Sequence, residues 1–154
     1  MSGNVGRKFW EWDEGRVLAE AATANAPTAV LLAEDDDEMR RMLAGALRRE
    51  GYAVTEARDG DELLEQVRDS VLRSEGGTAV DLVISDIRMP GHPALDVLRI
   101  LRESDWAVPV ILITAFGDSE LHRKARECGA TLVLDKPFEV GDLCAAANLF
   151  AAPR

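Results

Sequence analysis

The sequence is poor in the residues from which disulfide frameworks, zinc clusters and thiol redox centres are built. It contains two cysteines and two histidines in 154 residues. Cys128 and Cys144 are too few for a disulfide framework, and their spacing is not that of a Cys-x-x-Cys metal or redox motif. We therefore expect both cysteines to behave as buried or half-buried small hydrophobic residues.

Long apolar runs are also missing. No run approaches the ~20 residues that a membrane-spanning helix needs. The first thirty residues lack the charged start and continuous apolar core of a signal peptide. The sequence therefore predicts a cytoplasmic protein with no membrane insertion.

Positive charge is scarce relative to negative charge. The chain carries 18 Lys and Arg against 28 Asp and Glu, for a formal net charge of −10. This balance argues against a protein that binds nucleic acid directly, because such a protein presents a basic stripe to the phosphate backbone. Basic residues do cluster at Arg40-Arg41, at Arg48-Arg49 and in 122–126, but acids are interleaved with them in helical patterns. We expect these clusters to be solvated helix faces.

The chain is instead rich in short apolar runs that alternate with amphipathic helical patterns. The strand-like runs cover 29–33, 52–56, 82–86, 108–114 and 131–134, and the helical patterns cover 39–47, 63–72, 95–101, 118–128 and 140–150. Five strand–helix units predict an α/β fold with a doubly wound parallel sheet and helices on both faces. The flavodoxin-like strand order 2-1-3-4-5 fits this pattern.

The helical pattern 118–128 is thinly apolar. Only Leu121, Ala125 and Cys128 are available to face a core. A helix with so few apolar contacts is expected to be loosely anchored to the sheet.

Two segments fall outside the strand–helix plan. Residues 1–27 are expected to form an N-terminal extension, either a frayed tail or a short helix docked on this domain or on a partner. Gly15 weakens a helix there and Pro27 ends it. The loop 73–79 contains Gly-Gly and is expected to be a surface excursion without chemistry.

Four of the strand-like runs end at polar groups of different chemistry. These groups are Glu34 and Asp35 after the first run, Asp86 at the end of the third, Thr114 at the end of the fourth, and Lys136 just after the fifth. Because the carboxyl ends of parallel strands meet at one edge of the sheet, these groups are expected to share one crevice. A strand-end carboxylate such as Asp86 can attack a phosphorus atom. Crowded carboxylates repel one another unless a divalent cation neutralises them, and oxygen-only ligands favour Mg²⁺.

These motifs, in this order, resemble the receiver domain of bacterial response regulators from about residue 28 to residue 150. The similarity is carried by LLAEDD at 31–36, DLVISDIRMPG at 81–91, ITAF at 113–116 and DKPF at 135–138. The resemblance implies a stand-alone receiver domain at 28–154, with no output domain in this chain. Its implied function is that of a phosphorylation-dependent switch of a two-component system. Its only catalysis would be its own phosphoryl transfer and dephosphorylation, so it would not be an enzyme.

The implied phosphoryl donor is another molecule. His92 and His122 look like surface residues without a neighbour that would make either of them a phosphoryl carrier. The resemblance points to a phosphohistidine on a sensor histidine kinase or a phosphotransfer protein. The altered surface would then be read by a downstream protein target, and a homodimer is left open.

The resemblance also implies a ligand set for Mg²⁺. Asp86 would be the phosphorylated residue and would share the metal with Asp35. The backbone carbonyl of Arg88 would complete the protein ligands, and Glu34 would act through water.

The remaining residues carried over from the family concern the phosphoryl group and the switch. Thr114 would donate its hydroxyl and Lys136 its ammonium to the phosphoryl group, with the small Ala115 leaving access. Many receivers have an aromatic residue three positions before the site lysine, which swings inward on activation. This chain has Val133 there, whose β-branched side chain cannot make that swing. Switching is therefore expected through Phe116 and the helix that follows it.

Two alternatives stay open. A haloacid-dehalogenase-like phosphatase also attacks with a strand-end Asp and uses a Thr and a Lys. It requires a second Asp where this chain has Arg88, and usually a cap domain for which 154 residues leave little room. A degenerate receiver that acts as a constitutive binding module is the other alternative, and the complete set of acids, hydroxyl and ammonium argues against it.

Overall fold

The computed structural model describes residues 26–73, 80–115 and 118–154. The strands are β1 (Ala29–Ala33), β2 (Ala53–Ala57), β3 (Leu82–Asp86), β4 (Val110–Ala115) and β5 (Leu132–Lys136), and the helices are α2 (Asp37–Arg49), α3 (Gly60–Arg73), α4 (Ala94–Glu103), α5 (Ser119–Glu127) and α6 (Val140–Phe150). The expectations for residues 1–25, for the loop 74–79 and for Phe116 lie outside the described residues.

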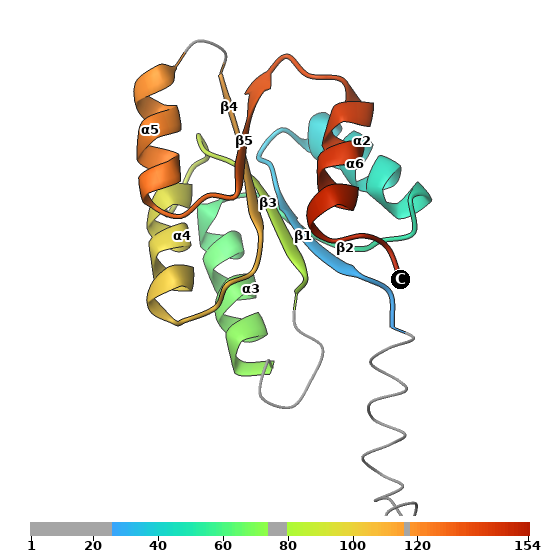
Figure 1. The fold of residues 1–154 in the computed structure, drawn as a ribbon, viewed down its shortest axis with the longest axis horizontal. Helices are drawn as coiled ribbons and strands as arrows, with labels where there is room; N and C mark the ends of the chain where they lie inside the picture. The colour runs from blue at the N-terminus through green and yellow to red at the C-terminus, as the bar shows by residue number, and fades with distance from the viewer. Residues whose placement is uncertain (1–25, 74–79, 116–117) are drawn as a thin grey trace, which may run out of the picture.

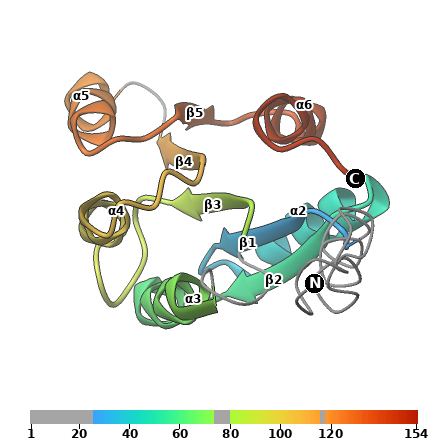
Figure 2. The ribbon, with the colours of Figure 1, turned by 60° about the horizontal axis from the view of Figure 1, so that its bottom comes forward.

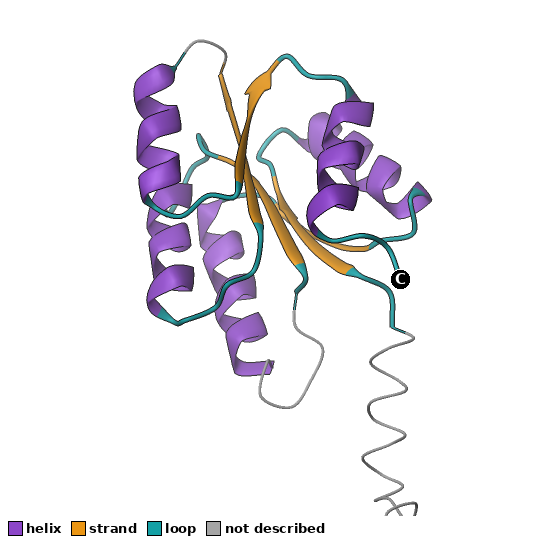
Figure 3. Ribbon diagram, in the orientation of Figure 1, coloured by secondary structure: helices purple, strands orange, loops and turns teal. Residues whose placement is uncertain are grey.

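The strands form one parallel sheet in the order β2-β1-β3-β4-β5, which confirms the predicted doubly wound topology. Helices α3, α4 and α5 cover one face of this sheet, and α2 and α6 cover the other (Figure 1, Figure 2). The result is a helix–sheet–helix sandwich (Figure 3). A separate apolar cluster fills each interface between the sheet and its helices.

Burial differs along the sheet because β1, β3 and β4 have a neighbour on both sides, whereas β5 is an edge strand. All five residues of β3 are buried, and all five residues of β5 are only partly buried. Strand β5 runs to Lys136, so the lysine that was expected just beyond the strand is its last residue and pairs with Ala115. Strand β4 begins at Val110, two residues later than predicted, because Pro109 has no N–H to offer and the carbonyl of Val108 accepts from Arg102 instead.

Helices α2 and α5 start at the carboxyl edge of the sheet with an aspartate as N-cap residue. Asp36 caps α2 by accepting from the Met39 backbone N–H at 2.8 Å, and Asp118 caps α5 by accepting from Leu121 at 3.0 Å. These bonds satisfy donors that a helix N-terminus leaves without partners. As predicted, α5 is thinly held, because Ala125 is its single fully buried residue.

The loop after β3 is packed against the start of α3. The Gly60 backbone N–H donates to the carbonyl of Pro90 at 2.8 Å. A Cβ atom on Gly60 would lie 1.8 Å from the carbonyl oxygen of His92, so only glycine fits at this position. This contact fixes the path of the chain just beyond Asp86.

The C-terminal residues return to the start of the sheet. The hydroxyl of Thr28 donates to the carbonyl of Ala152 at 2.9 Å, and the Arg154 guanidinium contacts Asp81 at 3.1 Å. The predicted burial of the cysteines is confirmed, with Cys144 buried and Cys128 partly buried. Within the described ranges, no helix is long and apolar enough to span a membrane.

Candidate functional site

The polar groups selected from the sequence meet at the carboxyl edge of the sheet. Glu34 and Asp35 follow β1, Asp86 ends β3, and Lys136 ends β5. The parallel register places Asp86 beside Ile113, one residue before Thr114. Residues that are up to 102 positions apart in the sequence, Glu34 and Lys136, therefore come within ion-pair distance of each other.

Asp86 is hydrogen-bonded through both of its carboxylate oxygens. Its Oδ2 accepts from the Lys136 ammonium at 2.6 Å, and its Oδ1 accepts from the backbone N–H of Arg88 at 2.9 Å. The residue is 5% exposed. Burial disfavours the charged form of Lys136, but the hydrogen bond and the charge of Asp86, together with Glu34, outweigh it and raise the lysine pKa.

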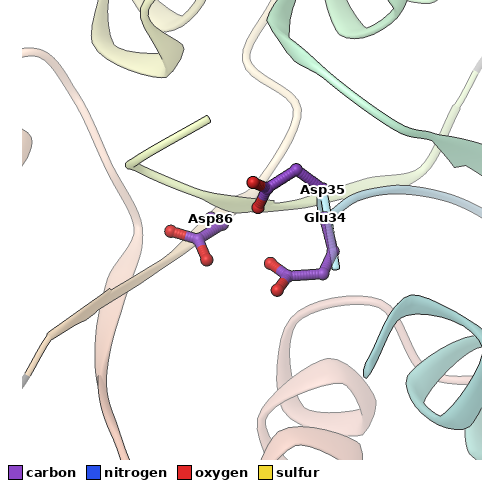
Figure 4. A group of neighbouring side chains, drawn as sticks. All are labelled: Glu34, Asp35 and Asp86. Carbon is purple, nitrogen blue, oxygen red and sulfur yellow. The ribbon is translucent and has the colours of Figure 1, made fainter. Parts of the chain in front are cut away.

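The three acids form one cluster. One carboxylate oxygen from each of Glu34, Asp35 and Asp86 lies within 4.8 Å of the others (Figure 4). Glu34 and Asp86 are buried and Asp35 is exposed, so the cluster is open to solvent on one side.

Glu34 has an unpartnered carboxylate oxygen and a raised pKa. Its Oε2 is buried and has no hydrogen-bond partner among the described residues. Burial, followed by the interactions with Asp86, raises the pKa of Glu34 to about 7, although Lys136 acts in the opposite direction. A buried carboxylate oxygen with no partner, next to two further carboxylates, is the kind of oxygen donor set that a hard divalent cation satisfies.

Thr114 supplies a second buried polar atom without a partner. The residue is 1% exposed, and its Oγ1 makes no hydrogen bond within the described part of the chain. Ala115, the next residue, is exposed and its side chain is a single methyl group. Val133 is partly buried against the apolar cluster on the α3–α5 face.

Arg40 corrects an expectation drawn from the sequence. The sequence predicts a solvated helix face for this residue, but Arg40 is 5% exposed. Its guanidinium donates to the carbonyl of Glu34 at 3.1 Å and contacts Glu56 at 3.2 Å and Asp37 at 2.7 Å. Acceptors from the residue that follows β1, from β2 and from α2 thus converge on one buried cation and hold the backbone of Glu34 in place.

His122 also differs from its expected place. Its side chain is 18% exposed, and Nε2 is paired with the carboxylate of Asp135, so the residue ties α5 to β5. His92 is exposed as expected and is paired with Asp61. Neither pair could be read from local sequence, because each joins elements that meet only through the fold.

Arg88 connects the site to α5. Its backbone contacts Asp86, as described above, and its guanidinium is 3.1 Å from the carboxylate of Asp118. The side chain of Arg88 is 70% exposed.

Comparison with known proteins places these features in a family. The family model of the response regulator receiver domain matches residues 30–148. The transcriptional regulatory protein PdtaR of Mycobacterium tuberculosis is 38% identical over 129 residues, which are 83% of this chain and 58% of PdtaR. The transcriptional regulatory protein CpxR of Escherichia coli is 38% identical over 117 residues, which are 75% of this chain and 46% of CpxR. The chain therefore spans about half the length of these relatives.

Solved structures give the same result. The receiver domain of the Francisella response regulator 1452 has a TM-score of 0.70 and 26% identity, covering 80% of this chain and 95% of that one. Chemotaxis response regulator CheY4 of Vibrio cholerae has a TM-score of 0.69 and 26% identity, covering 80% of this chain and 98% of that one. None of these matches supports the phosphatase alternative. The chain belongs to the response regulator receiver domains, the phosphorylation-dependent switches of two-component signal transduction.

Proposed function

We propose that Asp86 of this chain accepts a phosphoryl group from a phosphohistidine donor and that the altered surface is read by a downstream protein. The observation that carries the proposal is the pairing of the Asp86 carboxylate with the Lys136 ammonium at 2.6 Å, at the carboxyl edge of the sheet. A carboxylate fixed at both oxygens is held in one orientation for attack.

The transfer step joins Asp86 to an incoming phosphoryl donor. A carboxylate oxygen of Asp86 forms a bond to phosphorus while the bond between phosphorus and the donor nitrogen breaks, and the electron pair leaves with that nitrogen. Lys136 already contacts Asp86, so its ammonium can follow the negative charge onto a phosphoryl oxygen. The Thr114 hydroxyl, which has no partner in the described chain, is assigned as a further donor to the phosphoryl group.

We assign Mg²⁺ to the acid cluster. Asp35 and Asp86 are the direct carboxylate ligands, Glu34 acts through water, and the backbone carbonyl of Arg88 completes the protein ligands. The buried, unpartnered Oε2 of Glu34 supports this assignment. When bound, the cation neutralises the carboxylates and the phosphoryl oxygens, which would otherwise repel one another.

The remaining assignments concern the chain as a whole. We place the receiver at 28–154 and the N-terminal extension at 1–27, and we propose a cytoplasmic protein without substrate turnover beyond its own phosphoryl chemistry. The donor is a sensor histidine kinase or a phosphotransfer protein. The relatives PdtaR and CpxR are transcriptional regulators. With a net charge of −10, this chain is not expected to contact DNA itself.

Intact-protein mass spectrometry tests the assignment of Asp86. Incubation with Mg²⁺ and acetyl phosphate should add one acid-labile phosphoryl group to the full chain, and Asp86→Asn should abolish the gain. Asp105→Asn is a matched control, because Asp105 is exposed and has a positive φ that asparagine tolerates. The control should keep the full gain. The same gain in Asp86→Asn would refute the assignment.

A further inference from the structure

An ion pair joins the loop after β3 to Asp118, the N-cap residue of α5. The Arg88 guanidinium lies 3.1 Å from Oδ2 of Asp118, with side-chain exposures of 70% and 30%. The backbone N–H of the same arginine donates to Oδ1 of Asp86 at 2.9 Å. Arg88 therefore touches the proposed phosphorylation site with its backbone and the start of α5 with its side chain.

Asp118 both pairs with Arg88 and caps α5. Its Oδ1 caps α5 by accepting from the Leu121 N–H at 3.0 Å, while its Oδ2 faces Arg88. The bond from Leu121 and, after it, the Arg88 guanidinium lower the pKa of Asp118, so the residue stays charged. Among the residues that the structure describes, the pair between His122 and Asp135 also ties α5 to the body of the domain.

We propose that Arg88 and Asp118 form a latch that phosphorylation of Asp86 opens. Arg88 leaves Asp118, pairs with the new phosphoryl group, and releases the first turn of α5. This inference rests on the proposed function and names the way in which the signal reaches α5.

Charge explains why the arginine changes partner. At rest, Asp86 is already paired with the Lys136 ammonium, and the Arg88 guanidinium pairs with Asp118. A phosphoryl group brings a charge of about −1.5 to −2 and three strong acceptor oxygens. A guanidinium matches such a group with two parallel hydrogen bonds, whereas an exposed pair with a single carboxylate contributes little.

The position of the Arg88 side chain and the remaining contact of α5 with β5 favour the same exchange of partners. The Arg88 side chain starts beside Asp86, since the two residues already share a hydrogen bond of 2.9 Å. Once the latch is open, the contact between the His122 side chain and Asp135 still anchors α5 on β5. The loosening should therefore be confined to the two backbone amides that bond to Asp118, those of Leu121 and His122.

NMR on the full chain tests the latch. Amide exchange at Leu121 and His122 is compared before and after phosphorylation by acetyl phosphate, with intact mass measured on the same sample. The wild type should exchange about two- to fivefold faster once phosphorylated, the factor that corresponds to losing an exposed ion pair. The Arg88 Nε resonance should shift in the same step.

Asp118→Asn separates the charge from the cap, because asparagine is an equally good N-cap residue. This variant should show the faster exchange before phosphorylation and no further increase after it. Asp96→Asn is the matched control, since it removes an exposed carboxylate from the first turn of α4, where Asp96 pairs with Arg99 at 3.0 Å. The control should behave as the wild type does.

The outcomes are distinct. A full mass gain without change at Leu121, His122 or Arg88 Nε would overturn the latch and leave the proposed function standing. A full mass gain with the same response in Asp118→Asn as in the wild type would also overturn it. Absence of any mass gain would overturn the proposed function and the exchange of partners with it.

Discussion

Helices α2 and α5 both follow a strand that ends at the site, and both are capped by an aspartate, yet the sheet holds them very differently. Helix α2 buries Arg40, Leu43, Ala44, Ala46 and Leu47, whereas α5 buries Ala125 alone. A helix held by few buried contacts opens and shifts at low cost. Glu34 and Asp35 therefore lie directly before a firmly packed helix, whereas α5, through which we propose that the response to phosphorylation runs, is loosely packed.

The strands repeat this contrast. Asp86 ends β3, which is buried along its whole length, and Lys136 ends β5, which is partly exposed along its whole length. We infer that Asp86, the proposed nucleophile, is fixed by the interior of the sheet and that the Lys136 ammonium facing it is carried by the edge strand. An ammonium on a flexible stem at an edge strand can adjust its position as the charge of Asp86 changes.

The largest expected effect is on the free energy of unfolding when one apolar side chain is removed from α2 or from α5. Leu43 on α2 is fully buried, and Leu121 on α5 is only partly buried. Leu43→Ala should lower the free energy of unfolding by about 2–5 kcal/mol, whereas Leu121→Ala should lower it by about 1 kcal/mol because less is removed from the core. Urea unfolding of both variants measures the difference. Equal losses would mean that α5 is as firmly anchored as α2.

A smaller loss of stability is expected when Arg40, the buried cation on α2, is replaced. Arg40→Met should leave the Glu34 carbonyl without its donor and lower the free energy of unfolding by about 1–3 kcal/mol. Arg123 on α5 pairs only with exposed acids, so Arg123→Met should change stability by less than about 0.5 kcal/mol. Thermal unfolding of the two variants compares them. A neutral Arg40→Met would show that the guanidinium does not brace the site.

Two acids near the start of α2, Asp35 in the acid cluster and Glu38 outside it, should differ in their effect on Mg²⁺ binding. Asp35→Ala should weaken Mg²⁺ binding by at least about tenfold, because one of the proposed carboxylate ligands is lost. Glu38→Gln removes a nearby exposed acid in the first turn of α2 and should leave the affinity unchanged. Line broadening in an NMR titration with paramagnetic Mn²⁺ reports both affinities. Unchanged binding in Asp35→Ala would remove this residue from the ligand set.

Much of this arrangement could be predicted from the sequence because each candidate site residue lies at the carboxyl end of an apolar strand or just after it. Local apolar runs located the strand ends at Glu34, Asp86, Thr114 and Lys136, and parallel topology then brought those ends together. The few apolar residues of α5 likewise predicted its weak burial. These features depend on local pattern and on one general rule of sheet geometry.

The contacts that could not be predicted join side chains across elements. The burial of Arg40 depends on acceptors supplied by Glu34 after β1 and by Glu56 in β2, which no pattern within α2 reveals. The pair of Arg88 with Asp118 spans 30 positions, and the pair of His122 with Asp135 spans 13. Whether such charges meet depends on the exact offset of a helix against a strand, which the apolar pattern does not determine.

The central claim is that phosphorylation changes the loosely packed α5 and leaves the firmly packed α2 unchanged. Hydrogen exchange of the whole chain, with and without phosphorylation, tests this claim most directly. We predict that exchange changes mainly in residues 114–129, with little change in 29–47 and around Val133, because the added charge acts on the element that is least anchored. Mass spectrometry of peptides from the unmodified and phosphorylated protein gives the comparison. Equal protection of 114–129 in both states, or a change centred on α2, would contradict the account.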